Sequence, residues 1–287
     1  MTHIPEPMVD QPRFSFEFFP TKTPQGEEKL REVHRQLAAL QPDFFSVTYG
    51  AGGSTREGTR HIVEAIHKAG SSVAPHLSFG GSSEADILAL LNDYKGMGIA
   101  RLVALRGDIP SGTGATSSYY YANELVEFVR RHTGDHFHIE VACYPEIHPK
   151  SESYDSDLRF FKKKVDAGAN GAITQYFYNP DAYFYYVERC QDMGITIPIV
   201  PGIMPITHYA NLARFSSNCG AEIPRWIRQR LQAYGDDADS IRDFGIEVVS
   251  QLCDALLDGG APGLHFYTMN QAGPVSAIWH NLGLSAR

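Results

Sequence analysis

A glutamate inside an aromatic segment is the side chain of this sequence best suited to acid–base chemistry. Glu17 lies in the run Phe-Ser-Phe-Glu-Phe-Phe-Pro at residues 14–20. Side chains of a β-strand alternate between two faces, so both faces of this strand look buried. A buried carboxylate is costly, and it either takes a raised pKa or acquires a dedicated partner. The segment predicts proton transfer by Glu17, and a structural ion pair with an interior Lys or Arg is the alternative.

Other polar residues follow short β-rich segments along the chain. They are Thr48 with Tyr49, His76, Arg106 with Asp108, Tyr144 with Glu146 and His148, Gln175, and Tyr267 with Asn270. A metal hydrolase commonly has a His-x-His on its first strand, where this chain offers only Glu17 among phenylalanines, so metal catalysis is disfavoured. No lysine lies within a β-rich segment, as a Schiff-base aldolase would need. A Gly-x-Ser-x-Gly elbow is also missing. The set favours hydrogen bonding to a large planar ligand over hydrolysis.

A scaffold that gathers strand ends is needed to bring these side chains together. We expect eight strands, near 13–19, 43–49, 72–77, 100–105, 137–144, 171–177, 197–201 and 263–267. Helices are expected near 25–39, 55–69, 82–97, 117–133, 152–167, 180–193, 206–218, 236–258 and 273–282, with an extra short helix within 221–237, before the last strand. This alternation, without a dinucleotide-binding glycine fingerprint, predicts an α/β fold of the (β/α)₈ TIM-barrel type. We expect residues 1–12 to be a flexible segment and 13–287 to form one catalytic domain.

Composition argues against several classes of partner. The net charge of −8 and the pI near 5.8 disfavour nucleic acid. The most apolar stretch, 195–206, contains three prolines and is too short to span a bilayer, so no membrane partner is expected. Four widely spaced cysteines and an N-terminus without a signal pattern predict a cytoplasmic protein with reduced thiols.

The chain resembles the bacterial methylenetetrahydrofolate reductases over nearly its whole length from residue 14. Nine segments carry the resemblance: 16–20 (FEFFP), 47–51 (VTYGA), 74–77 (APHL), 103–108 (VALRGD), 144–149 (YPEIHP), 164–170 (KVDAGAN), 173–175 (ITQ), 201–203 (PGI) and 265–268 (HFYT). Each is weak alone, but together, in the family's order and at predicted strand ends, they are specific.

The resemblance implies a ping-pong flavoenzyme. NADH or NADPH would reduce bound FAD, and the flavin would then reduce 5,10-methylenetetrahydrofolate to 5-methyltetrahydrofolate, a methyl source for methionine synthesis. Glu17 would protonate the nitrogen that departs when the substrate ring opens, and desolvation is expected to keep it protonated nearer neutral pH. Asp108 would contact folate and flavin and tune the flavin potential. A homo-oligomer, with a tetramer as one form, is also implied.

The resemblance further implies the residues that bind each ligand. FAD would contact Thr48, Tyr49, Ala51, His76, Arg106, Gly107, Asp108, Ala122, Tyr144, His148, Asp157, Lys163 and Lys164, with cations near its diphosphate. Folate would contact Gln175, Asn211, Phe215 and Gln271, and no metal is expected. The family commonly has Gln where this chain has Asn211 and Arg where it has Gln271. These two differences concern the binding of folate and leave the flavin assignment untouched.

Alternatives stay open at the level of the sequence. Asp108 could be a helix N-cap, His76 and His148 could be hydrogen-bonded core histidines, and Phe215 could be a core residue. Two other functions are compatible with the pattern. One is a flavin-binding or folate-binding relative that has lost reductase activity, for which Gln271 is the hint. The other is a flavin-free barrel lyase or transferase that uses Glu17 as an acid.

Overall fold

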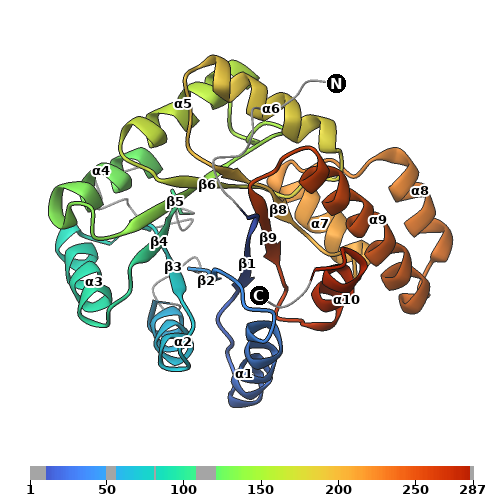
Figure 1. Cartoon of the computed structure of the whole chain (residues 1–287), viewed down its shortest axis with the longest axis horizontal. Coiled ribbons are helices and arrows are strands. Elements are labelled where there is room, and N and C mark those ends of the chain that lie inside the picture. The colour runs from blue at the N-terminus through green and yellow to red at the C-terminus, as the bar shows by residue number, and fades with distance from the viewer. Residues whose placement is uncertain (1–10, 50–55, 81, 108–120, 285–287) are drawn as a thin grey trace.

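A nearly closed barrel of parallel strands forms the centre of the protein (Figure 1). The computed structural model describes residues 11–49, 56–80, 82–107 and 121–284. Its strands are β1 (Arg13–Phe18), β2 (Phe44–Val47), β3 (Val73–Leu77), β4 (Arg101–Ala104), β5 (His138–Cys143), β6 (Gly171–Thr174), β7 (Ile199–Val200), β8 (Gly202–Ile203) and β9 (Gly263–Tyr267). They pair in the order β7-β6-β5-β4-β3-β2-β1-β9-β8, and every pair is parallel. The predicted α/β barrel is therefore confirmed.

Helices surround this barrel on the outside (Figure 1). They are α1 (Pro24–Ala38), α2 (Arg56–Lys68), α3 (Glu84–Gly96), α4 (Ala122–Thr133), α5 (Tyr154–Asp166), α6 (Pro180–Asp192), α7 (Tyr209–Cys219), α8 (Arg225–Tyr234), α9 (Ala238–Asp258) and α10 (Gly273–Asn281). The extra short helix expected within 221–237 is α8, which packs on α9 at the periphery. No helix among the described residues has both the length and the apolar character that crossing a membrane requires.

Local sequence explains where the helices begin. Thr23 accepts a hydrogen bond from the backbone N–H of Gly26 and precedes a proline, which suits the first turn of a helix. Ser83 and Asp86 form a reciprocal capping box at the start of α3. The expected helix at 117–133 begins at Ala122 in the described part of the chain, and residues 117–120 lie outside it. Residues 1–10 also lie outside it, so the flexible segment and the single domain stay predictions.

The seventh strand position is divided, which differs from the eight continuous strands expected. Residues 199–200 pair with β6, residues 202–203 pair with β9, and Pro201 lies between the two pieces. Proline has no N–H to donate to a sheet ladder, but its carbonyl still accepts the backbone N–H of His265 at 3.0 Å. The barrel thus closes through two very short strands.

The first strand has the two faces that its sequence predicts. Phe14, Phe16 and Phe18 are almost completely buried on the outer face, where the rings of Phe14 and Phe16 pack against Trp279 of α10. The inner face carries Ser15 and Glu17, whose contacts lie within the barrel. The outer aromatic layer therefore fixes the rotation of β1 and directs Glu17 inward.

Candidate active site

A cavity of about 870 Å³ opens at the carboxyl ends of the strands. Such ends hold the active site in barrel enzymes, and the volume lies in the range of cofactor and substrate sites. Its polar and aromatic lining includes Glu17, Thr48, Tyr49, His76, Ser78, Arg106, Tyr121, Tyr144, His148, Asp157, Phe160, Lys164, Gln175, Tyr176, Phe215, Tyr267 and Met269. The barrel thus gathers into one cavity side chains that lie up to 250 residues apart in the chain.

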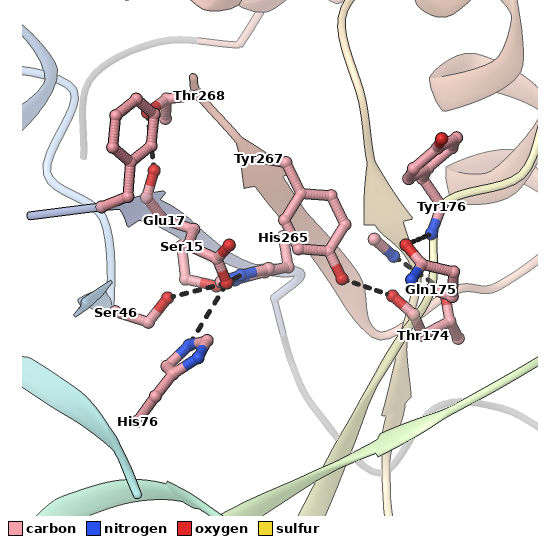
Figure 2. Close-up of polar contacts among 12 residues, drawn as sticks. Ser15, Glu17, Ser46, His76, Thr174, Gln175, Tyr176, His265, Tyr267 and Thr268 are labelled. Atoms are coloured by element: carbon pink, nitrogen blue, oxygen red, sulfur yellow. Dashed lines mark hydrogen bonds and ion pairs between the residues drawn. The ribbon is translucent and has the colours of Figure 1, made fainter. Parts of the chain in front are cut away.

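Glu17 is surrounded by hydroxyl and imidazole groups from three neighbouring strands (Figure 2). Its Oε2 atom lies 3.2 Å from His76 Nε2, 3.5 Å from His265 Nε2 and 3.5 Å from Ser46 Oγ, which donates a hydrogen bond. His76 and His265 are both buried. No lysine or arginine pairs with Glu17 among the described residues, so the alternative of an ion pair with an interior Lys or Arg is not found, and the neighbours of the carboxylate are histidines instead.

The environment of Glu17 favours the carboxylate. Burial is the largest single influence and raises its pKa, but the attraction and hydrogen bonds of His76 and His265 outweigh it and lower the pKa from 4.5 to about 2. The expectation of a raised pKa is therefore wrong. The reason is that two imidazoles, which the sequence of the first strand does not reveal, face the carboxyl group.

This lowered pKa predicts an acid-dependent loss of stability. A group with a depressed folded-state pKa stabilises the fold fully above its unfolded value of 4.5, and the contribution disappears as the pH falls through about 2. The shift corresponds to at most about 3 kcal/mol. Urea unfolding of the wild type and of Glu17→Gln should show the free-energy difference shrinking from about pH 5 to about pH 2. A difference that stays constant over this range would contradict an ionised Glu17.

The loop after β9 holds the backbone around Glu17. Thr268 donates its hydroxyl to the Glu17 carbonyl at 2.6 Å. Asn270 makes two hydrogen bonds to the backbone of Phe19, accepting from its N–H at 3.0 Å and donating to its carbonyl at 2.9 Å. Met269 and Asn270 both have positive backbone φ angles, 52° and 55°, which residues other than glycine seldom adopt. The strained turn thus anchors the end of the strand that carries Glu17.

Cationic side chains lie in another part of the cavity. Lys164 donates from Nζ to the Ala142 carbonyl at 2.5 Å, and burial lowers its pKa. Arg106 also lines the cavity. Asp157 accepts the His148 N–H at 3.0 Å and the Ser151 hydroxyl at 2.9 Å, and so fixes the loop after β5. A held lysine and an exposed arginine beside hydrogen-bonding loops are suited to an anionic ligand such as a diphosphate.

A pair of exposed aromatic rings marks the rim of the same cavity. Tyr121 and Phe160 are stacked, with ring centroids 5.9 Å apart and planes 18° apart. Arg106 lies over Tyr121 at 5.7 Å, and Lys163 lies over Phe160 at 5.1 Å. Neither ring was predicted from the sequence as a site residue. Both belong to the cavity lining, whereas Lys163 is engaged with Phe160 and does not line the cavity.

Gln175 and Tyr267 form the side of the cavity where the barrel closes (Figure 2). The backbone N–H of Tyr176 donates to Gln175 Oε1 at 3.0 Å, which leaves the amide nitrogen of Gln175 to donate to a ligand. The Tyr267 hydroxyl donates to the Thr174 carbonyl at 2.7 Å and joins β9 to β6. Gly202 lies against this contact, and a Cβ there would meet the Tyr267 ring and the Thr174 carbonyl.

Most of the predicted site residues meet in the cavity. Those that line it are Glu17, Thr48, Tyr49, His76, Arg106, Gly107, Ala122, Tyr144, His148, Asp157, Lys164, Gln175 and Phe215. Lys163, Asn211 and Gln271 are exposed and do not line it, so their binding roles stay predictions. Ala51 and Asp108 lie outside the described residues. Within the described part of the chain, no three His, Cys, Asp or Glu side chains are arranged to hold a metal ion.

Several known proteins are similar to this chain in sequence over most of its length. The family described as Methylenetetrahydrofolate reductase matches residues 3–283. A 5,10-methylenetetrahydrofolate reductase of Escherichia coli (strain K12) is 38% identical over 271 residues, covering 94% of this chain and 90% of the relative. One from Buchnera aphidicola is 39% identical over 283 residues, covering 97% and 94%. A relative from Zea mays, Methylenetetrahydrofolate reductase (NADH) 1, is 38% identical over 285 residues, covering 94% of this chain and 48% of its own.

A solved structure with a distant sequence supports the same architecture. It is an uncharacterized protein from Clostridium thermocellum that binds two copies of 5-methyl-5,6,7,8-tetrahydrofolic acid. Its TM-score is 0.69 at 15% identity, and the match covers 94% of each chain. At that identity the likeness concerns the fold alone, whereas the sequence matches extend over almost the whole chain. The chain belongs to the methylenetetrahydrofolate reductase family.

Proposed function

We propose that the protein reduces 5,10-methylenetetrahydrofolate to 5-methyltetrahydrofolate with FAD as bound cofactor and NADH or NADPH as donor. The observation that carries this proposal is the combination, in one cavity, of the buried acid–base group at Glu17 with the cations Arg106 and Lys164 and an aromatic rim. The named activity of the bacterial relatives supports it. Three plant relatives carry NADH in their names, which makes NADH the first donor to test.

The cavity residues fit a flavin dinucleotide. Lys164 and Arg106 would hold the diphosphate, and burial strengthens the interaction because the lysine has little water around it. Tyr121 and Phe160 offer flat surfaces at the rim, and Tyr49 and Tyr144 line the interior. When bound, the flavin would accept hydride from the nicotinamide and donate it to the folate.

The remaining chemistry falls to groups of the chain. Glu17 would give a proton to the folate nitrogen that departs as the five-membered ring opens, which makes that nitrogen a better leaving group. Gln175 would donate from its amide to the pterin, and Phe215 would pack on the ligand from α7. Asp108 and Ala51 are proposed contacts in the part of the chain outside the described residues.

We also propose Lys163, Asn211 and Gln271 as ligand contacts. The protein is further proposed to be a cytoplasmic homo-oligomer, with residues 13–287 as its single catalytic domain.

Two half-reactions followed by flavin absorbance test the proposal. The purified protein, reconstituted with FAD, should bleach with NADH or NADPH and recover its colour with methylenetetrahydrofolate. Bleaching without recovery would leave a flavin-binding relative that has lost reduction. A protein that cannot be reconstituted with FAD would overturn the flavin assignment and favour a barrel lyase that uses Glu17 as an acid.

A further inference from the structure

A buried histidine and serine lie beneath Glu17, away from the cavity. His265 on β9 is completely buried, and Ser15 on β1 is 4% exposed. Ser15 Oγ lies 2.7 Å from His265 Nδ1, and His265 Nε2 lies 3.5 Å from Glu17 Oε2 (Figure 2). Neither residue lines the cavity. The three groups form a chain that leads from the barrel interior to the carboxylate at the cavity.

We propose that His265, oriented by Ser15, stores the proton that Glu17 delivers to the substrate. This inference rests on the proposed function, because it concerns the source of the proton for the folate nitrogen. It resolves a difficulty of the site, since a carboxylate that is ionised between its histidines has no proton of its own to donate. His265 acts through Glu17 and is a positioning and proton-supplying residue.

The transfer balances with the groups present. In the charged imidazolium, Nδ1–H donates to Ser15 Oγ and Nε2–H faces Glu17 Oε2. When the substrate arrives, the Nε2–H bond breaks, its electron pair stays on the ring, and the proton moves to the Glu17 carboxylate. The carboxyl group then passes a proton to the departing nitrogen, which becomes an N–H. His265 ends neutral with its proton on Nδ1, so Ser15 selects the nitrogen that exchanges.

The surroundings of His265 single out Glu17 as its acceptor. On its own strand, the ring of Tyr267 lies at 5.3 Å, but the Tyr267 hydroxyl donates to Thr174 and its pKa is raised by burial. From β2, Phe44 stacks on the imidazole at 6.2 Å. His76, the other imidazole at Glu17, lines the cavity itself, and its Nε2 lies 3.2 Å from the carboxylate. Of these two imidazoles, His265 is the one whose two nitrogens both have partners among the described residues, Nδ1 with Ser15 and Nε2 with Glu17.

His265→Gln separates proton storage from simple hydrogen bonding. A glutamine amide keeps an N–H donor toward Glu17, but it cannot release a proton. We expect reoxidation by methylenetetrahydrofolate to slow at least about tenfold, and its dependence on pH to flatten, with bleaching by nicotinamide within about twofold of the wild type. Ser15→Ala should slow the same half-reaction by a smaller factor. His138→Gln is the matched control, because His138 faces Glu140 in the barrel outside the cavity lining, and both half-reactions should be unchanged.

Histidine NMR supplies a readout that does not depend on activity. In ¹⁵N-histidine-labelled protein without ligands, His265 should carry its proton on Nδ1 when neutral, and Ser15→Ala should shift this population toward Nε2–H. Reoxidation of His265→Gln at the wild-type rate and with the wild-type pH profile would overturn the proposal, as would a neutral His265 with Nε2–H in the wild type. Equal slowing of both half-reactions by both variants would assign the pair a structural role. A wild-type protein that fails to reduce folate would instead overturn the proposed function.

Discussion

Replacement of Glu17 by glutamine is expected to stop folate reduction while flavin reduction by nicotinamide continues at nearly the wild-type rate. Glutamine fills the same volume and can still accept from Ser46, but it cannot carry the proton that the departing nitrogen needs. Loss of a general acid costs about a hundredfold or more. Hydride transfer from nicotinamide requires no such proton, so the effect should fall on one half-reaction only.

Stopped-flow measurement of the two half-reactions checks this expectation. Glu140→Gln is a matched control, because Glu140 is also a buried barrel carboxylate with a histidine partner but does not line the cavity. It can lower stability, since Glu140 contacts Arg101 and His138, but it should leave both half-reactions unchanged. If Glu17→Gln slows the two half-reactions by the same factor, the carboxyl group shapes the site and does not donate the proton.

Replacement of Lys164 by methionine is expected to weaken FAD binding strongly. Methionine keeps most of the buried aliphatic length and removes the charge, so the ring of Phe161 beneath it keeps its packing. A hydrogen bond to a charged group contributes about 1.5–3 kcal/mol, which corresponds to a Kd increase of about 10- to 100-fold.

Lys162→Met is the internal control for this experiment. Lys162 lies two residues earlier on α5, carries the same charge and pairs with Asp166 outside the cavity lining. Fluorescence titration of the protein with FAD should show a change of less than about threefold for this variant, as is usual for a surface ion pair. Equal losses for the two variants would mean that the net charge of α5, and not the buried Lys164 ammonium group, attracts the cofactor.

Site residues could be predicted from the sequence when the alternation along one strand is enough to fix the direction of the side chain. Alternation along 14–18 placed Glu17 inside the barrel, and the rhythm of strands and helices placed other polar residues at the same end. The ionisation of Glu17 could not be predicted in this way. It depends on His76 and His265, which reach the carboxylate only through the register of β1 with its neighbours, and His265 lies 248 residues away. The sequence did hold one signal for His265: it lies two residues before Tyr267 in a β-rich segment, so both side chains face the same side of that strand.

Side chains on helices and loops were harder to place. Lys163 and Lys164 are adjacent on α5, and only the second lies in the cavity, because neighbouring residues on a helix point about 100° apart. Asn211 and Gln271 were assigned by resemblance, and both are exposed in the described structure. The division at Pro201 was also missed, since residues 202–203 continue the pairing beyond the expected end of the seventh strand.

That division gives the barrel wall a local weakness beside the folate-binding side of the proposed site. Only two-residue strands join β6 to β9 there, so few backbone hydrogen bonds must break for this wall to open. Gln175, which follows β6, and Tyr267 of β9 line the cavity on the two sides of this junction. The Tyr267 hydroxyl bridges it by donating to the carbonyl of Thr174, the residue before Gln175. The Gly202 N–H also donates to Thr174 Oγ1 at 2.9 Å, so side-chain hydrogen bonds of Thr174 and Tyr267 supplement the short strands at this wall, while the turn at 268–270 holds β1 and Glu17. In the proposed cycle, a nicotinamide and a pterin would meet this wall in turn.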